Sequence, residues 1–338
     1  MRIGVALPQY DYSVPGENPL RFEVMLEHAQ VAEQVGYDAL YLSDHLWLDL
    51  AKYGADATGY GIFEPLVTLG ALARSVPRVT LGTLVLCEAF RPAALLAKAV
   101  ATLDRISGGR TEIGLGGGWY EPEYAAIGME LPPPAIRLAR LGEALDVLTG
   151  ALEARGEPFD HDGEYHRAAG ARILPPSIQQ PRPPVFVGGK GDRLLRLALE
   201  KADGWNLCWT ATPDAYRGRL EVLVRTAAEV GRDPATLTRS LGLYALAGEN
   251  ERDLAARYAR LQANTPAGIL DDVPLERFRA DKLVGTVEQI QEQAEEWAEL
   301  GVESLILGVG AVPFQLGSLE DLELLADALC SNPGTEAD

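Results

Sequence analysis

The sequence predicts a single (β/α)8 TIM barrel with insertion loops, because eight short apolar runs alternate with eight helical patterns along one continuous chain. No linker-like stretch interrupts this alternation, and 338 residues, 47% of them hydrophobic, are enough to bury one large core. A doubly wound open sheet would show a similar alternation, but eight consecutive units favour the closed barrel. We expect one domain over residues 1–330 and a disordered tail over residues 331–338.

The expected strands are the short apolar runs, and each of them precedes a segment with helical periodicity or an insertion. They lie at Arg2–Leu7, Ala39–Ser43, Thr80–Leu86, Thr111–Leu115, Pro184–Val187, Gly204–Leu207, Thr238–Ala247 and Ser304–Leu307.

Capping signals set the helix boundaries. Gly36 occupies the usual C′ position after the first helix. Pro65 and Pro92 open the next two helices, where proline is favoured. Thr286, with Gln289 three residues later, forms a capping-box pattern. The expected helices are Leu20–Val35, Pro65–Ser75, Pro92–Ile106, Ile136–Glu153, Asp192–Lys201, Pro213–Val230, Val287–Leu300 and Leu319–Cys330.

Three connections are longer than ordinary barrel loops. They span Trp47–Glu64, Arg155–Arg182 and Glu249–Asp281, and the second could hold a small hairpin. Long connections within a compact domain are usually lids or binding loops. We therefore expect these insertions to shape a binding site.

Composition excludes several classes of protein. The formal charge of −19 argues against nucleic-acid or anionic-membrane partners, because both need clustered basic residues. No apolar run reaches 18 residues, and no signal segment precedes the first strand. Cys87, Cys208 and Cys330 are odd in number and far apart, which indicates neither a disulfide framework nor a metal site. We expect a cytoplasmic protein.

Asp44 and His45 are the strongest candidates for catalysis. They follow the apolar strand Ala39–Ser43, and charged or titratable groups at such a strand end are costly unless something binds there. His45 is one of only four histidines and is the one best placed for proton chemistry. The alternative is a capped turn with a hydrogen-bonded histidine.

Two glycine-rich segments also follow predicted strands. Gly188, Gly189, Lys190 and Gly191 precede a helix, so backbone N–H groups and the helix N-terminus can converge on a phosphate. The run Gly116-Gly117-Gly118 permits close contact between backbone and ligand. The alternatives are a glycine-rich tight turn for the first segment and a flexible strand end for the second. Together the segments suit a planar, phosphorylated ligand, and no spacing of ligands suggests a metal site.

Seven further stretches identify a family. In the order in which it carries them, the chain resembles the bacterial-luciferase-like superfamily of flavin- and deazaflavin-dependent oxidoreductases, over nearly its whole length. The stretches are residues 32–45, 64–66, 78–83, 104–110, 114–119, 183–189 and 202–205.

The resemblance implies a barrel that holds reduced FMN or coenzyme F420, a deazaflavin, at the carboxyl ends of its strands. It implies a cis peptide bond between Leu84 and Val85 beneath the cofactor ring. Thr83, Leu84, Val85 and residues 116–118 would line the ring, and residues 188–191 would receive the phosphate. Family members commonly form homodimers through helices near strands two and three, so a homodimer is expected.

The Ser-Asp-His sequence is similar to that of the deazaflavin-dependent dehydrogenases in this superfamily. By this similarity Asp44 would contact the ring and His45 would be the acid or base. Those enzymes carry a glutamate where this chain has Trp119, and Glu121 and Glu123 are spaced differently. We therefore expect His45 to lack a glutamate partner. We also expect an apolar or aromatic substrate beside three tryptophans, which are Trp47, Trp119 and Trp209.

Three functions remain open from the sequence. The first is coenzyme F420-dependent hydride transfer to or from a small organic substrate. The second is an FMNH2-dependent monooxygenase that works with a separate flavin reductase; an F420 reductase would be the corresponding partner in the first case. The third is a protein that binds a cofactor without turnover, although the presence of Asp44 and His45 speaks against it.

Overall fold

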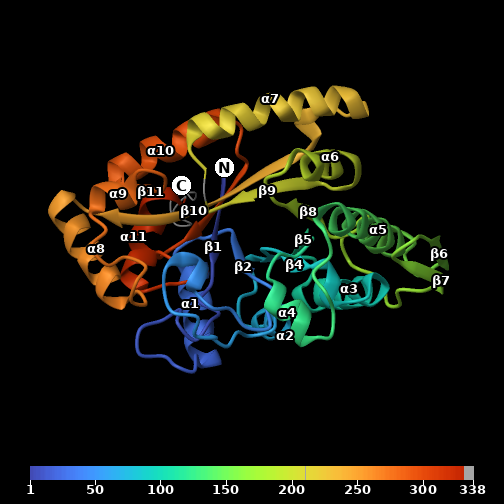
Figure 1. The fold of residues 1–338 in the computed structure, drawn as a ribbon, viewed down its shortest axis with the longest axis horizontal. Coiled ribbons are helices and arrows are strands. Elements are labelled where there is room, and N and C mark those ends of the chain that lie inside the picture. The colour runs from blue at the N-terminus through green and yellow to red at the C-terminus, as the bar shows by residue number, and fades with distance from the viewer. Residues whose placement is uncertain (210, 331–338) are drawn as a thin grey trace, which may run out of the picture.

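The computed structural model describes residues 1–209 and 211–330, and it confirms a closed parallel barrel (Figure 1). β10 pairs with both β9 and β12, and β12 pairs with β1, so the sheet closes on itself. The expected disordered tail lies outside the described residues. The barrel strands are β1 (Arg2–Ala6), β2 (Ala39–Leu42), β3 (Thr80–Thr83) with its continuation β4 (Leu86–Cys87), β5 (Thr111–Gly116), β8 (Val185–Gly188), β9 (Gly204–Cys208), β10 (Thr238–Gly248) and β12 (Ser304–Gly308).

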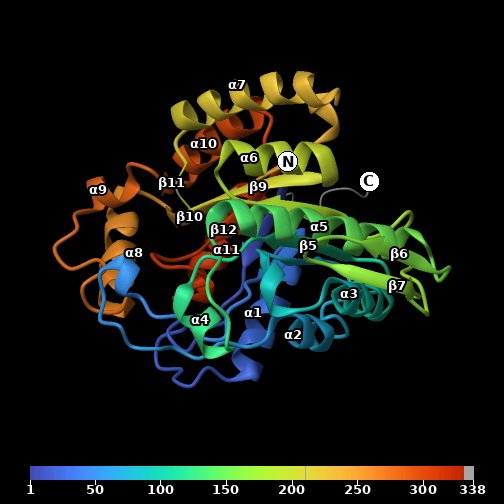
Figure 2. The same ribbon diagram turned by 45° about the vertical axis from the view of Figure 1, so that its right-hand side comes forward.

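Helices surround the strands on the outside of the barrel (Figures 1 and 2). Each expected helix is present with ends shifted by at most a few residues, and the capping box of Thr286 and Gln289 is formed. The helices are α1 (Phe22–Gln34), α2 (Pro65–Leu72), α3 (Ala93–Ser107), α5 (Pro134–Glu153), α6 (Asp192–Lys201), α7 (Pro213–Val230), α10 (Val287–Glu299) and α11 (Leu319–Leu329).

Two layers of buried side chains hold the barrel together. Aliphatic residues fill the space between strands and helices, such as Leu40, Leu81 and Val187. A second cluster, rich in aromatic residues, lies near the carboxyl ends of the first strands and includes Tyr10 and Phe314. The aromatic cluster forms a rigid base for the segments at the barrel mouth.

The first two insertions have little regular structure. The first contains a single 3-10 turn, η1 (Ala51–Tyr53), and isolated bridges join it to Tyr10, in the segment after β1, and to itself. The second contains the expected hairpin, formed by antiparallel β6 (Phe159–Asp162) and β7 (Arg167–Ala171). Between β5 and α5 lies a short helix that the sequence did not reveal, α4 (Glu121–Ala126).

The third insertion contains unpredicted elements. They are α8 (Glu251–Asn264) and α9 (Leu275–Arg279). Directly after the insertion, β11 (Leu283–Thr286) pairs in parallel with the end of β10. Only Leu254, Tyr258 and Leu261 of α8 are buried among charged residues, so its apolar stripe is narrow. These residues form a small core of their own with parts of β10 and α9.

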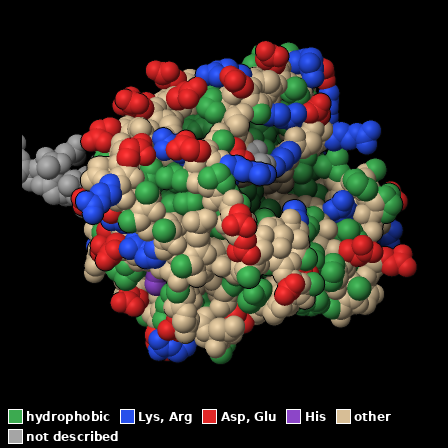
Figure 3. Space-filling model, turned by 60° about the vertical axis from the view of Figure 1, so that its left-hand side comes forward, with side chains coloured by type: hydrophobic (Ala, Val, Ile, Leu, Met, Phe, Trp, Pro, Cys, Tyr) green, Lys and Arg blue, Asp and Glu red, His purple; other side chains and the backbone are tan. Residues whose placement is uncertain are grey.

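No described helix combines the length and apolar character needed to cross a membrane. The three cysteines are free thiols. Acidic side chains are widely spread over the face shown in Figure 3, and hydrophobic side chains gather in and around a hollow.

Candidate active site

The carboxyl ends of the barrel strands surround a cavity of about 400 Å³, the catalytic cavity. This is the face on which (β/α)8 enzymes hold their ligands. Side chains of the first insertion and of the segment after β12 complete its walls. Many of the expected site residues line it: Asp44, His45, Leu84, Val85, Gly116, Gly118, Trp119, Gly188, Gly189, Lys190 and Trp209.

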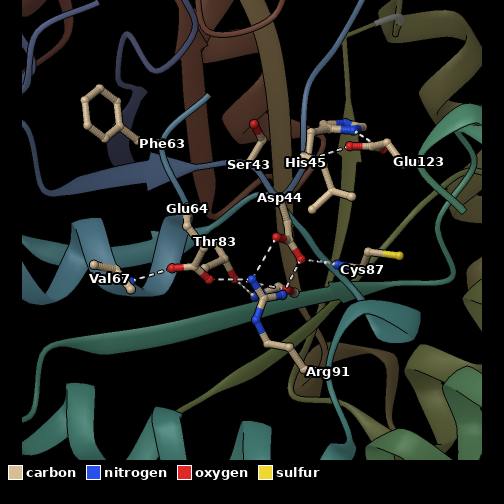
Figure 4. Close-up of polar contacts among 12 residues, drawn as sticks. Ser43, Asp44, His45, Phe63, Glu64, Val67, Thr83, Cys87, Arg91 and Glu123 are labelled. Atoms are coloured by element: carbon tan, nitrogen blue, oxygen red, sulfur yellow. Dashed lines mark hydrogen bonds and ion pairs between the residues drawn. The ribbon is translucent and has the colours of Figure 1, made fainter. Parts of the chain in front are cut away.

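His45 is paired with a buried carboxylate. Its Nδ1 lies 2.7 Å from Oε2 of Glu123, whose side chain is 2% exposed. Oε1 of the same carboxylate accepts a hydrogen bond from the backbone N–H of Leu46. Figure 4 shows the imidazole and the carboxylate facing each other. The expectation that His45 lacks a glutamate partner is therefore wrong.

Glu123 reaches His45 because α4 begins immediately after the residues that leave β5. Pro122 lies in the first turn of α4, where proline is favoured, and Glu123 follows it with its side chain turned inward. Glu121 on the same helix is exposed. Comparing position 119 with the family's glutamate could not reveal this partner. The carboxylate comes from residue 123, four positions later, and the first turn of α4 brings it to the histidine. An acidic residue in the first turn of a helix at a strand end was the available signal.

Asp44 points away from His45, toward an arginine and a backbone amide (Figure 4). Its Oδ2 accepts hydrogen bonds from Nη1 of Arg91 at 2.6 Å and from the N–H of Cys87 at 2.8 Å. Its Oδ1 accepts from Nη2 of Arg91 at 3.0 Å. Arg91 also binds Glu64, the N-cap residue of α2. Asp44 therefore ties the end of β2 to β4 and α2, whether or not it also contacts a cofactor.

The end of β2 is fixed on its other side by Gln9. The side chain of Gln9 is fully buried and exchanges hydrogen bonds with the backbone of Ser43, accepting from its N–H at 2.7 Å and donating to its carbonyl at 2.9 Å. The hydroxyl groups of Ser43 and Tyr10 lie 2.7 Å apart. Because both sides are fixed, the backbone that carries His45 has little freedom.

The peptide bond between Leu84 and Val85 is cis, as the family resemblance implied, and both side chains line the cavity. Thr83 is placed differently from the prediction, because it does not line the cavity. Its hydroxyl accepts from the N–H of Gly114 at 2.9 Å and donates to the carbonyl of the same residue at 3.0 Å. Thr83 therefore joins β3 to β5 inside the barrel.

Packing within the protein already explains several of the glycines. A Cβ atom added to Gly116 would lie 2.9 Å from Cγ2 of Val85, and one added to Gly188 would lie 2.8 Å from its Cγ1. A Cβ atom on Gly118 would lie 2.8 Å from Sγ of Cys87. These positions therefore require glycine even without a ligand.

A second cavity of about 430 Å³, the arginine groove, opens beside the loop after β8. Gly117 and Gly191 line it, together with Arg137 of α5 and Arg193 of α6. Within the described residues, the buried Nε of Arg137 has no hydrogen-bond partner. The N–H of Gly189 is already bonded to the carbonyl of its neighbour on β9. A phosphate here would therefore meet the arginines and the start of α6 rather than this amide.

Aromatic side chains form the remaining wall of the catalytic cavity. Nζ of Lys52 lies 4.1 Å from the centre of the Trp119 ring. The Trp119 and His45 rings pack edge-to-face, with their centres 5.7 Å apart. Trp209 stacks on Tyr244. Trp47 is placed differently from the prediction: it does not line the cavity and instead packs edge-on against Tyr120. Sequence reasoning missed five lining residues from the insertion and the last loop, which are Leu48, Lys52, Tyr53, Pro313 and Phe314.

The thiols in the cavity are poor acids. Burial raises the pKa of Cys87 to about 11, and it raises the pKa of Cys208 to about 11 although Lys190 and Lys52 act in the opposite direction. Both thiols therefore keep their protons at neutral pH. The His45 imidazole is the better candidate for proton transfer.

Two of the remaining three histidines, His28 and His166, have structural surroundings. Nδ1 of His28 lies 2.7 Å from the carbonyl of Val24 in the same helix. Nε2 of His166 lies 2.8 Å from Oε1 of Glu88, which anchors the hairpin of the second insertion beside β4. Within the described residues, no group of three or more histidine, cysteine, aspartate or glutamate side chains could hold a metal ion.

The mouth of the barrel therefore combines an imidazole–carboxylate pair with an adjoining groove lined by arginines. Residues 1–304 match the family model described as luciferase-like monooxygenase, and the chain belongs to this family of oxidoreductases.

One relative by sequence and two solved structures of similar fold are informative. The chain is 31% identical over 302 residues to an F420-dependent hydroxymycolic acid dehydrogenase of Mycobacterium tuberculosis. The matched region covers 87% of this chain and 79% of the relative. The fold of this chain matches an F420-dependent secondary alcohol dehydrogenase in complex with an F420-acetone adduct, with a TM-score of 0.76 and 20% identity over 97% and 98% of the two chains. It also matches the oxygenating constituent of 3,6-diketocamphane monooxygenase of Pseudomonas putida in complex with FMN, with a TM-score of 0.72 and 19% identity over 98% of each chain.

Proposed function

We propose that this protein transfers a hydride between coenzyme F420 and a secondary alcohol or ketone, and that His45 moves the accompanying proton. The observation that carries the proposal is the His45–Glu123 pair beside the cavity. An imidazole that is held at one nitrogen can exchange a proton through the other. The choice of substrate rests on similarity to the hydroxymycolic acid and secondary alcohol dehydrogenases.

Glu123 determines which nitrogen of His45 is available to a substrate. An ionised carboxylate only accepts hydrogen bonds, so Nδ1 keeps its hydrogen while it is bonded to Oε2. Nε2 then carries the lone pair, and no hydrogen bond to this atom occurs among the described residues. It can take the proton of an alcohol or return one to the oxygen of a ketone as that ketone is reduced. Glu123 stabilises the charged imidazolium between these events.

The arginine groove fits a phosphorylated cofactor, because the unpartnered Nε of Arg137 and the start of α6 are both favourable for an anion. Arg137 and Arg193 would hold the phosphate, and Leu84 and Val85 would line the ring. When bound, F420 gives or receives the hydride at a carbon of its ring. The aromatic wall would keep water from that part of the cavity.

A second candidate function is an FMN-dependent monooxygenase with a separate flavin reductase as partner. The similar fold that binds FMN favours it, and the arginine groove would accept the phosphate of FMN as well. A third function, binding of a cofactor without turnover, would give the His45–Glu123 pair no catalytic role.

Two assays distinguish these functions: F420 oxidation without oxygen, and oxygen consumption with reduced FMN. Reduced F420 would be mixed with ketones, and formation of oxidised F420 would be followed by its fluorescence. We expect turnover that falls by at least about 100-fold in His45→Ala, the usual scale for removing a general acid or base. Oxygen consumption with reduced FMN, without any F420 oxidation, would instead establish the monooxygenase. Binding of F420 with no reaction in either assay would favour the protein without turnover.

We also propose a homodimer formed through α2 and α3. Val67 of α2 is 76% exposed and Leu95 of α3 is 61% exposed, which is unusual for large apolar side chains unless another surface covers them. Light scattering would give the mass of the wild type and of Val67→Glu. A dimer that dissociates in the variant is expected, and a monomeric wild type would contradict the proposal.

A further inference from the structure

The catalytic cavity has a neighbour on the side of the third insertion. A cavity of about 470 Å³, the distal cavity, shares Tyr53 and Trp209 with it. Other walls of the distal cavity come from Leu270, Val273 and Phe278, between the end of α8 and the start of β11. Figure 1 shows α8 and α9 beside the far end of β10. Two side chains therefore line both the catalytic cavity and a second space of similar size.

Trp209 forms this partition in an unusual backbone conformation. Its φ is 72°, in the left-handed region that side chains other than glycine rarely adopt. Its N–H donates to the carbonyl of Gly242 at 2.8 Å. A Cβ atom added to Gly308 would lie 2.7 Å from Cζ3 of the indole, so that position must be glycine for the indole to fit. Residues in such conformations cluster at ligand sites. Here the backbone conformation places the indole where it lines both cavities.

The distal cavity contains an unsatisfied polar group. Tyr244 lines it with a side chain that is 5% exposed, and its hydroxyl has no hydrogen-bond partner among the described residues. Burial raises the pKa of this hydroxyl well above its ordinary value, so it remains neutral and can both donate and accept. A buried hydroxyl without a partner is unfavourable. A ligand oxygen that reached this hydroxyl from the cavity would satisfy it.

The other walls indicate what kind of molecule would enter. Ile269, Leu270, Val273 and Phe278 present apolar surface. Lys282 is already paired with Asp281 at 2.5 Å and lies over the Phe278 ring at 5.0 Å. Arg277 also lines the cavity, so its charged groups come from residues 277–282. The remaining walls suit an apolar group, with an uncharged oxygen beside Tyr244.

We infer that the distal cavity is the outer part of the substrate site, and that it takes the alkyl or aryl remainder of an extended ketone or alcohol. An uncharged oxygen on that remainder pairs with the Tyr244 hydroxyl. Trp209 limits how far the substrate reaches and so determines specificity. This inference rests on the proposed function for the identity of the reacting group, but the distal cavity would bind such molecules whether or not they react.

Binding of methyl ketones of increasing chain length tests the inference. Calorimetry with the full protein measures affinity, and the F420 assay measures kcat/KM for the same ketones. We expect affinity to rise by about fourfold for each added methylene group until the distal cavity is filled, as burial of apolar surface predicts. A long ketone with a terminal hydroxyl should bind more tightly than its plain counterpart.

Two variants and one control make the test specific to the distal cavity. Tyr244→Phe should abolish the advantage of the terminal hydroxyl, and Trp209→Phe should alter the chain length at which affinity levels off. Tyr216 provides the control, because its buried hydroxyl also lacks a partner among the described residues but lines neither cavity. Tyr216→Phe should leave both properties as in the wild type.

The outcomes separate this inference from the proposed function. Affinity that depends on chain length, without any turnover, would support the distal cavity and contradict the proposed function. Turnover of short ketones with affinity independent of chain length would overturn the inference and leave the function intact. Equal effects of Tyr244→Phe and Tyr216→Phe would also overturn it.

Discussion

Glu123 accepts two hydrogen bonds, one from His45 and one from the backbone of Leu46. Only a carboxylate can accept both with separate oxygens, whereas the amide of glutamine would turn an NH2 group toward one of the two donors. We expect Glu123→Gln to lower kcat by about 100-fold or more, the scale on which general acid–base catalysis operates. Steady-state kinetics over a range of pH would measure the loss.

A matched control for this prediction lies on the same helix. Glu121 is exposed two residues away, so Glu121→Gln removes a similar charge without touching His45. We expect its kinetics to resemble those of the wild type. A Glu123→Gln variant with full activity would show that the histidine needs no orienting carboxylate.

Cys87 and Cys208 have a pKa of about 11, against an ordinary value of 9.0, because they are buried. Only the thiolate reacts with disulfide reagents, so at pH 8 both should react about 100-fold more slowly than an ordinary thiol. Unfolding should restore fast reaction. Labelling kinetics in native buffer and in denaturant measure the difference, and a fast native reaction at either cysteine would contradict it.

The same shift affects stability at high pH. Because the folded pKa lies above the unfolded value of 9.0, the stabilisation from these thiols is complete below about pH 9 and is lost as the pH rises toward 11. Denaturant titrations at several alkaline pH values would follow this loss.

At the scale of elements, the side chain of Val85, which lies between β3 and β4, packs against glycines of β5 and β8. Gly116→Ala would bring a Cβ atom to 2.9 Å from Val85. We expect a loss of about 1–3 kcal/mol in the free energy of unfolding, the usual cost of overpacking a core. Chemical denaturation measures it.

Gly218 gives a control of opposite sign. It lies inside α7 with no atom within 4 Å of an added Cβ. Gly218→Ala should therefore stabilise the protein by about 0.5–1 kcal/mol through helix propensity. Equal effects of the two substitutions would mean that packing at Val85 is not the reason for glycine at position 116.

Elements with strong local signals could be predicted from the sequence. The eight barrel strands and their helices were found, because apolar periodicity and caps such as Thr286 specify them locally. α8 was missed because its apolar stripe is narrow, and α4 because six residues carry too little periodicity. The cis bond at Leu84 was implied only by the family resemblance.

The candidate site could be predicted in part. The strand-end residues Asp44 and His45 were placed at the cavity, because a barrel fixes where its strands end. The partners of these residues could not be predicted. Arg91 and Glu123 come from a loop and a short helix whose paths depend on tertiary packing.

At the scale of the whole molecule, the protein is acidic but its arginine groove is basic. The net charge is −19, yet Arg137 and Arg193 line the groove without an acidic residue among its walls, whereas Asp44 and Glu123 accompany Lys52 and Lys190 in the catalytic cavity. An anionic cofactor would therefore need local attraction that outweighs the general repulsion. The two arginines of the groove should carry most of this attraction, because charge-assisted contacts to phosphate are strong.

We expect Arg193→Gln to weaken cofactor binding by about tenfold, corresponding to the loss of one hydrogen bond to a charged group. Arg74 is exposed outside both cavities, so Arg74→Gln controls for the change in net charge. Fluorescence titration with F420 gives both dissociation constants. Equal constants for the two variants would place the phosphate elsewhere.

The most direct test of the account is a competition between the two cofactors for the wild-type protein. Oxidised F420 and FMN would be titrated separately and then together, and the bound species would be identified by its absorbance spectrum. We predict that F420 binds at micromolar concentrations and is the species recovered from the mixture. Recovery of FMN, or no binding of F420 at these concentrations, would contradict the central claim that this barrel carries out deazaflavin-dependent hydride transfer.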